Sequence, residues 1–175
     1  VANMSGIKRS GLSTDDIMRG GAARDELSGK NGDDTLYGDG GNDTLLAGSG
    51  NDLIFGGDQF DTINAGEGND TAFGGNGRDL VLLNQGNDLF NDNTQGGELG
   101  RDTVFGGFGN DTIQGGNGND EFHGQDGADL IFGRLGNGRT PGGDRVYMSH
   151  AGEAYNTLAG GNGRDLIFLN PGNDL

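Results

Sequence analysis

Apolar residues recur at every ninth position along most of the chain, between polar or small neighbours. The residue before each of them is often threonine, and a polar residue beside an inward apolar one is typical of a β-strand. One apolar residue in nine cannot fill a globular core, so the pattern predicts a three-residue strand in each unit. The inward set is Leu27, Leu36, Leu45, Ile54, Ile63, Ala72, Val81, Phe90, Val104, Ile113, Phe122, Ile131, Leu158 and Ile167.

The remaining six positions of each unit are rich in glycine and end in aspartate. The consensus is G-G-x-G-x-D-x-U-x, with U a bulky apolar residue, as in residues 38–46, 74–82 and 115–123. Positions one to six are predicted to form a turn, because glycine permits positive φ and close backbone approach. Asparagine at position five, as in Asn42 and Asn51, is interpreted as turn chemistry rather than as a binding group.

A fixed period of this length predicts a solenoid. Two units would make one coil of 18 residues, with a strand on each side and a loop at each end. The frame begins at Gly20, is interrupted by an insert at 92–96, and predicts about eight coils over residues 20–175. Residues 1–19 are interpreted as an N-terminal cap or linker. The irregular repeats at 133–159 span three units in length, so we expect the coil count to be kept, with Tyr147 in an aspartate slot and altered metal sites.

The composition excludes several classes of protein. The chain has 175 residues, 40 glycines, no cysteine and a formal net charge of −16, and only 30% of it is hydrophobic. A chain of low hydrophobicity and high net charge does not collapse unaided. It has no basic patch for nucleic acid, no thiolates for a disulfide or zinc, and no apolar run long enough for a transmembrane segment.

The periodic aspartates carry the candidate chemistry. Stacked coils would place each aspartate over the one 18 residues away, such as Asp34 over Asp52. Two carboxylates roughly 5 Å apart repel by on the order of 3 kcal/mol at an effective dielectric near 20. Ten such pairs would exceed the roughly 5–15 kcal/mol that stabilises a typical domain, so the stack needs cations. Carboxylate and carbonyl oxygens favour Ca²⁺ over Mg²⁺ or Zn²⁺.

The nonapeptide resembles the RTX (repeats-in-toxin), or hemolysin-type, calcium-binding repeat from Gly20 onward. The resemblance implies an all-β fold, a right-handed parallel β-roll, in which each Ca²⁺ lies between a loop and the loop one coil further on. On the order of eight to twelve ions are expected. The ligands that the resemblance implies are carboxylates at position six and backbone carbonyls of the glycine turn, namely Asp34, Asp43, Asp52, Asp61, Asp70, Asp79, Asp88, Asp102, Asp111, Asp120, Asp129 and Asp165, with Gly29, Gly38, Ala47, Gly56, Ala65, Gly74, Gly106, Gly115 and Gly124.

The resemblance also implies a function. Members of the family are typically secreted in one step, cross unfolded at low calcium and fold outside the cell. We therefore expect an extracellular calcium-binding module that folds on Ca²⁺ binding and stabilises or aids export of a larger secreted polypeptide. A chain that stops within a repeat unit, at Leu175, is expected to continue in a longer protein.

Two other functions were weighed. An adhesive or carbohydrate-binding module would depend on exposed aromatics such as Tyr37 and Phe55, which with Phe73 are expected to stack and stiffen one sheet. An enzyme is not expected, because no catalytic motif is present and His123 and His150 are interpreted as surface or structural residues.

Overall fold

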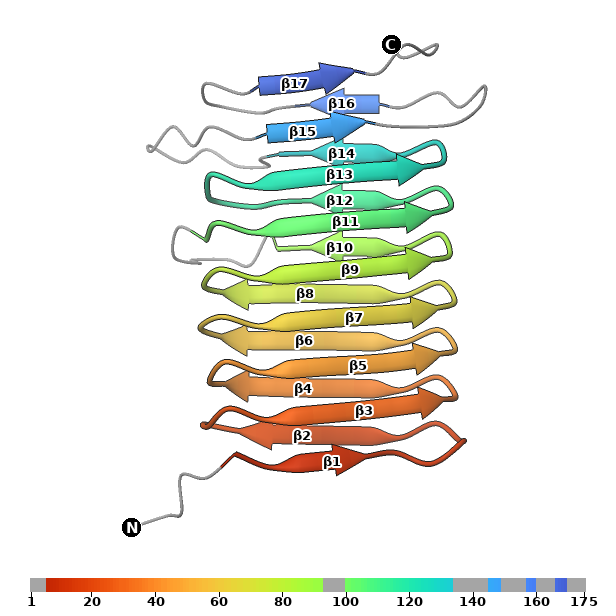
Figure 1. Ribbon diagram of the computed structural model, residues 1–175, viewed down its shortest axis with the longest axis vertical. Helices are drawn as coiled ribbons and strands as arrows, with labels where there is room; N and C mark the ends of the chain where they lie inside the picture. The colour runs from red at the N-terminus through yellow and green to blue at the C-terminus, as the bar shows by residue number, and fades with distance from the viewer. Residues whose placement is uncertain (1–5, 93–99, 134–144, 149–156, 160–165, 170–175) are drawn as a thin grey trace.

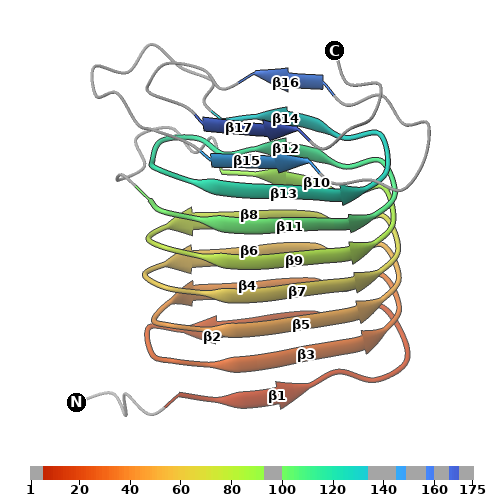
Figure 2. The same cartoon turned by 45° about the horizontal axis from the view of Figure 1, so that its top comes forward.

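The chain winds into a stack of coils, and each coil contributes one strand to each of two parallel sheets (Figure 1). The computed structural model describes residues 6–92, 100–133, 145–148, 157–159 and 166–169. Seen from the tilted view of Figure 2, one sheet lies in front of the other, and loops join them at both edges. This confirms the all-β parallel β-roll predicted from the period.

The two sheets alternate along the chain. One sheet contains, in spatial order, β1 (Lys8–Ser10), β3 (Glu26–Asn31), β5 (Thr44–Ser49), β7 (Thr62–Glu67), β9 (Leu80–Gln85), β11 (Thr103–Phe108), β13 (Glu121–Asp126), β15 (Arg145–Met148) and β17 (Leu166–Leu169). We call it the odd sheet. The even sheet contains β2 (Ile17–Gly21), β4 (Thr35–Gly40), β6 (Leu53–Asp58), β8 (Thr71–Asn76), β10 (Leu89–Asn91), β12 (Thr112–Gln114), β14 (Leu130–Phe132) and β16 (Thr157–Ala159).

The apolar residues of position eight form the core between the sheets, as predicted. Leu27, Leu45 and Ile63 from the odd sheet are fully buried, and so are Leu36 and Ile54 from the even sheet. Each side chain stacks on its counterpart one coil away, because the strands pair in register. The core is therefore a continuous column that no single coil could bury alone.

The strands are longer than the sequence pattern predicted. Most of them run for six residues, from position seven through position three of the next unit, so the turn is confined to positions four to six. Position one consequently lies in a strand and faces the core, where Ala47, Ala65 and Leu83 are fully buried. The prediction that positions one to six form a turn was wrong because parallel pairing continues through the glycines. Glycine at position two still has positive φ, for example +127° at Gly48.

The insert leaves the register of the sheets intact. Leu80 pairs with Thr103 and Leu89 with Thr112, so five extra residues are absorbed and each strand still meets its counterpart. The irregular segment behaves differently. Glu121 pairs with Arg145, whereas an unbroken repeat would place residue 139 there.

Tyr147 therefore occupies position nine, paired with His123, and does not fill an aspartate slot. The described residues between 133 and 159 form two strands, β15 and β16, where three units were expected. Extra loop residues absorb the difference, because strand pairing and core burial fix the register more strongly than chain length does.

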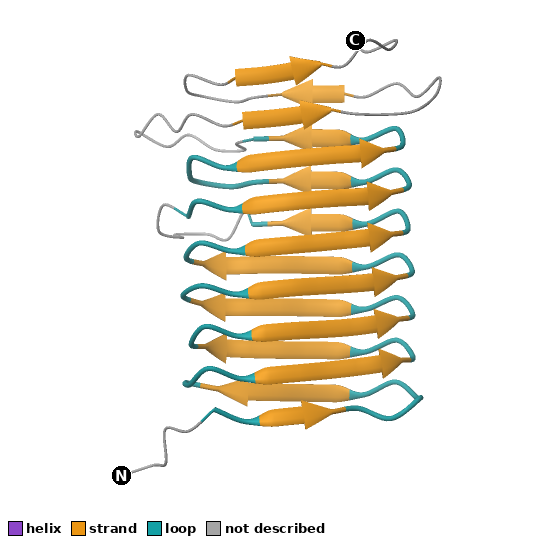
Figure 3. Ribbon diagram, in the orientation of Figure 1, coloured by secondary structure: helices purple, strands orange, loops and turns teal. Residues whose placement is uncertain are grey.

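Residues before Gly20 contribute to both sheets. β1 pairs with β3, and β2 pairs with β4, so strands of the roll begin at Lys8. Met18 extends the buried column upstream of Leu36. The described residues contain strands and loops only, as Figure 3 shows, and no helix suited to crossing a membrane is found among them.

Candidate metal centre

The aspartates of position six form two buried columns, one at each edge of the roll. Each of these side chains is at most 4% exposed, apart from Asp16, which is partly exposed. The column that leads into the even sheet contains Asp16, Asp34, Asp52, Asp70, Asp88, Asp111 and Asp129. The column that leads into the odd sheet contains Asp25, Asp43, Asp61, Asp79, Asp102 and Asp120. Asp165 lies outside the described residues.

Within a column, each carboxylate is tied to the coil before it. The Oδ1 atom of Asp52 accepts the backbone N–H of Asp34 at 2.7 Å, and Asp61 accepts that of Asp43 at 2.8 Å. The same bond crosses the insert, where Asp102 Oδ1 accepts the N–H of Asp79 at 2.8 Å. One oxygen of each carboxylate is thus used to hold the column together.

The second oxygen, Oδ2, is buried and accepts no hydrogen bond. This holds in both columns for Asp25, Asp34, Asp43, Asp52, Asp61, Asp70, Asp79, Asp88, Asp102 and Asp111. A buried carboxylate oxygen without a partner costs the fold a desolvation penalty of about 1–3 kcal/mol, and more when it is charged. Repetition of the same orphaned atom at every coil indicates a missing cationic partner common to all of them.

Burial is the main reason why these carboxyl groups resist ionisation. Desolvation raises the pKa of Asp43 and Asp52 to about 6, of Asp61 to about 7 and of Asp79 to about 8. The hydrogen bond from the preceding coil lowers these pKa values, and repulsion between neighbouring carboxylates raises them by less than burial does. The repulsion argument therefore identified the right conflict but the smaller of its two causes.

A small space lies beside each orphaned oxygen, between coils. A side-chain carbon added at Gly56 would lie 2.7 Å from Asp61 Oδ2 and would also contact the carbonyl oxygen of Gly74. At Gly38 it would lie 2.6 Å from Asp43 Oδ2, beside the carbonyl of Gly56. We call this space the cradle. A point so close to two oxygens excludes a carbon atom but matches the distance of about 2.3–2.6 Å between Ca²⁺ and its ligands.

The cradle recurs in both columns. It is bounded by the position-one residue, by the Oδ2 of the same unit and by the position-one carbonyl of the next coil. Complete examples involve Gly20 with Asp25, Gly29 with Asp34, Gly38 with Asp43, Gly56 with Asp61 and Gly106 with Asp111. The corresponding carbonyls come from Gly38, Ala47, Gly56, Gly74 and Gly124. Position one is glycine here for lack of room, since it does not have positive φ at these sites.

Other cradles are altered by their own side chains. Ala47, Ala65 and Leu83 stand at position one beside Asp52, Asp70 and Asp88, so that a methyl or isobutyl group enters the space. At Gly115 the space is taken by the ring of Phe122. The two columns are therefore unequal, because in the middle coils all three alkyl replacements fall in the column that leads into the even sheet.

Three acidic residues of the site were missed from the sequence. Asp16 and Asp25 precede Asp34 at the same nine-residue spacing, and Asp16 donates its N–H to Asp34 Oδ1 at 2.7 Å. Asp92 was assigned to the insert, yet it occupies position one of the even sheet, where it is buried and accepts the N–H of Gly75 at 2.7 Å. Burial and the nearby Asp102 raise the pKa of Asp92 to about 8.

The donor set fits calcium. No group of three or more His, Cys, Asp or Glu side chains converges on one point in the described ranges, so the remaining ligands would have to be backbone carbonyls. Hard oxygen donors of this kind, carboxylate and carbonyl, suit Ca²⁺. Proteins bind Zn²⁺ mainly through nitrogen and sulfur donors, which the cradles lack.

Polar and aromatic ladders support the columns from outside. At position five, Asn69 donates its N–H to Asn51 Oδ1 at 2.8 Å, so this residue links successive loops as well as shaping its own turn. Tyr37, Phe55 and Phe73 stack with ring centroids 4.9 Å apart, as expected.

A second aromatic ladder, on the odd sheet, was not foreseen. His123 lies between the rings of Phe105 and Tyr147, at centroid distances of 4.5 and 4.6 Å. Phe168 continues this stack at 4.7 Å from Tyr147. Irregular spacing along the chain hides this ladder from any search for an 18-residue repeat, because its members are brought together only by the corrected register.

Comparison with protein families finds a match to the RTX calcium-binding nonapeptide repeat. The matched segments are residues 10–45, 19–54, 55–90, 96–131, 105–139 and 150–175, which together cover most of the chain. A comparison with curated proteins finds no match.

Proposed function

The chain belongs to the RTX calcium-binding nonapeptide repeat family, whose repeats bind Ca²⁺, and from this premise we propose that calcium in the cradles drives the folding of this β-roll. The observation that carries the proposal is the row of buried carboxylate oxygens without a partner. A chain that buries so many ionisable groups is stable at neutral pH only if a cation compensates them.

Each proposed site combines three kinds of oxygen. The carboxylate Oδ2 of one loop and the position-one carbonyl of the next coil bound the cradle, and the adjacent carboxylate of the column completes the charge balance. The chain's own residues hold these groups in place, since the Oδ1 hydrogen bonds fix every carboxylate before an ion arrives. When bound, the ion supplies the positive charge that burial otherwise denies to the column.

We expect the sites with a glycine cradle to bind most tightly. They include those of Asp34, Asp43, Asp61 and Asp111. The carboxylates beside Ala47, Ala65 and Leu83 would be weaker sites or none, because the alkyl group excludes an ion from the same space. The number of ions therefore falls toward the lower part of the range of about eight to twelve.

The biological role that we propose is that of a folding module within a larger secreted protein. At low calcium the ionised chain, with its net charge of −16, remains expanded and suited to export. Outside the cell, calcium at about 10⁻⁴–10⁻³ M would be enough to fold a module of this type. The roll would then stabilise the polypeptide to which it is joined. The family is one of structural calcium-binding modules, and we assign no catalytic role.

A calcium titration tests this proposal. Far-UV circular dichroism and size-exclusion chromatography at pH 7.5 should show an expanded chain in chelator and a compact β-structure with calcium. Asp34→Asn should shift the midpoint to higher calcium, whereas the matched control Asp33→Asn should not. Asp33 is exposed in the same loop, and asparagine already stands at its counterpart, Asn51. Equal shifts for the two variants, or a full β signal in chelator, would reject the proposal.

A further inference from the structure

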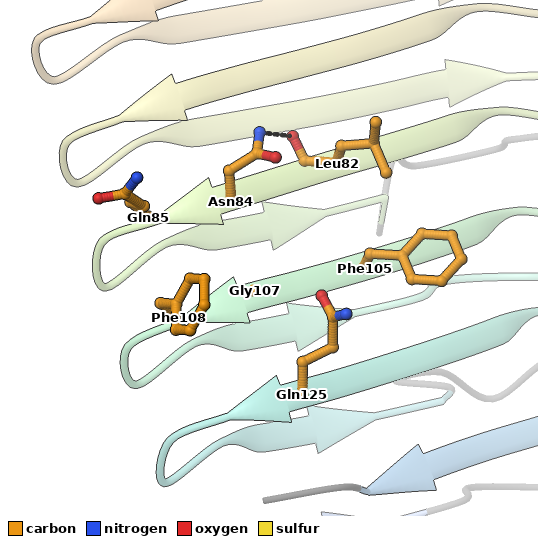
Figure 4. Close-up of a pocket in the computed structure, with 7 residues that line it drawn as sticks. All are labelled: Leu82, Asn84, Gln85, Phe105, Gly107, Phe108 and Gln125. Carbon is orange, nitrogen blue, oxygen red and sulfur yellow. Dashed lines mark hydrogen bonds between the residues drawn. The ribbon is translucent and has the colours of Figure 1, made fainter.

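A groove of about 390 Å³ crosses the outer face of the odd sheet, far from the cradles on the inner side (Figure 4). It spans β9, β11 and β13 near the ends of these strands. Its lining combines the two aromatic rings of Phe105 and Phe108 with the amide side chains of Asn84, Gln85 and Gln125. No charged side chain is among the residues that line it.

The groove exists because one coil lacks a side chain that its neighbours have. Gly107 pairs with Asn84 on one side and with Gln125 on the other, so an amide stands above and below an empty position. Strands in a sheet are about 4.8 Å apart, which puts the two amide-bearing strands roughly 10 Å apart. Phe105 and Phe108 close the two sides of the slot, and Figure 4 shows the ring of Phe108 near Gln85 at the edge of the sheet.

The polar groups are positioned but not consumed. Asn84 donates its Nδ2 hydrogens to Asn64 Oδ1 at 3.0 Å and to the carbonyl of Leu82 at 3.1 Å. This fixes the amide and leaves its Oδ1 as an acceptor. Within the described part of the chain, the exposed side chains of Gln85 and Gln125 make no hydrogen bond of their own. Phe108 is 63% exposed, an unusual state for a large apolar ring.

The two amides are kept at some conformational cost. Position two has positive φ in this roll, and Asn84 and Gln125 adopt φ values of 77° and 69° there. Glycine, which occupies this position in Gly66 and Gly107, would meet the same requirement without a side-chain penalty. Strain of this kind is often retained where a side chain serves a ligand.

We infer that this groove binds a neutral sugar, with one pyranose ring of a glycan seated over Gly107. The apolar C–H face of the ring would pack on Phe108, and the amides of Asn84, Gln85 and Gln125 would exchange hydrogen bonds with the hydroxyl groups. An acidic sugar fits less well, because no cationic side chain lines the groove and the chain is strongly acidic. A purely apolar ligand would leave three amides without partners.

Binding of calcium-loaded protein to neutral oligosaccharides tests the inference. The probes are cello-, manno-, malto- and galacto-oligosaccharides, screened by saturation-transfer NMR and then measured by calorimetry. Phe108→Ala should weaken binding about tenfold, since an aromatic contact of this kind contributes up to about 1.5 kcal/mol. Gln125→Gly should weaken binding while leaving the fold as stable or more stable, because glycine relieves the positive φ.

Two matched variants serve as controls. Lys30→Gly relieves the same backbone strain, at a φ of 86° in the same sheet, away from the groove. Phe60→Ala removes another exposed ring, which is 41% exposed outside it. Neither should change sugar affinity. Absence of binding to every neutral probe would overturn the inference, as would equal losses in the groove variants and the controls. Calcium-dependent folding tests the proposed function separately, since all four variants leave the cradles intact.

Discussion

Asp61→Asn is the sharpest test of the idea that burial of charge controls this fold. Asp61 is fully buried, and its Oδ2 has no hydrogen-bond partner. Burial raises the pKa of Asp61 from 3.8 to about 7. Because the pKa is raised in the fold, ionisation costs stability: the penalty is absent below pH 3.8, grows up to about pH 7 and is complete above it.

The expected effect in chelator is a gain in stability. A shift of this size corresponds to at most about 4 kcal/mol, which asparagine would remove. Asparagine instead places an unpartnered N–H₂ group where Oδ2 stood, at a cost of about 1–3 kcal/mol. The free energy of unfolding at pH 8 should therefore rise by about 1–3 kcal/mol, and this gain should nearly vanish at pH 5. With calcium the sign reverses, because the variant has lost a ligand.

Urea unfolding followed by circular dichroism measures both effects. A fixed concentration of a stabilising osmolyte keeps a folded baseline in chelator. Asp33→Asn, an exposed neighbour, should change stability by less than about 0.5 kcal/mol under either condition. If Asp61→Asn is as destabilising in chelator at pH 8 as it is in calcium, the reasoning from buried charge is refuted.

Three further outcomes follow from the same geometry. Gly56→Ala should lower the number of bound ions by one and Ala65→Gly should raise it by one, counted by native mass spectrometry; unchanged counts in both would mean that the cradle does not hold the ion. The calcium midpoint of folding should rise as pH falls from 8 to 5.5, because protons compete for Asp43, Asp61 and Asp79, whose pKa values are about 6, 7 and 8; a flat pH profile would contradict this. Leu45→Ala should destabilise the calcium-loaded roll by about 2–5 kcal/mol in thermal or urea unfolding, whereas Leu12→Ala, at a side chain 69% exposed, should have little effect.

The nine-residue period was sufficient to predict the roll, its core and most of the aspartate columns. Leu27, Leu36 and Leu45 are inward because one face of a two-faced strand must be apolar. The aspartates align because 18 residues make one coil. These features follow from local rules that each unit repeats, so a single sequence reveals them without knowledge of the whole fold.

Features that depend on contacts between coils were not predictable in the same way. The consensus suggested that all position-one glycines serve the turn, whereas Ala47, Ala65 and Leu83 show that this position faces the core. The role of Asp92 depends on a register that the insert shifts, and the placement of Tyr147 on pairing that skips irregular residues. Sequence spacing alone cannot weigh strand pairing against an added loop.

Anomalous X-ray scattering from crystals grown with calcium tests the central claim most directly, by locating the ions. The account predicts peaks in the cradles beside Asp43 and Asp61, between the carboxylate Oδ2 and a carbonyl of the next coil, and none in the same position beside Ala65. Peaks confined to the outer surface, with the cradles empty and the roll intact, would contradict it.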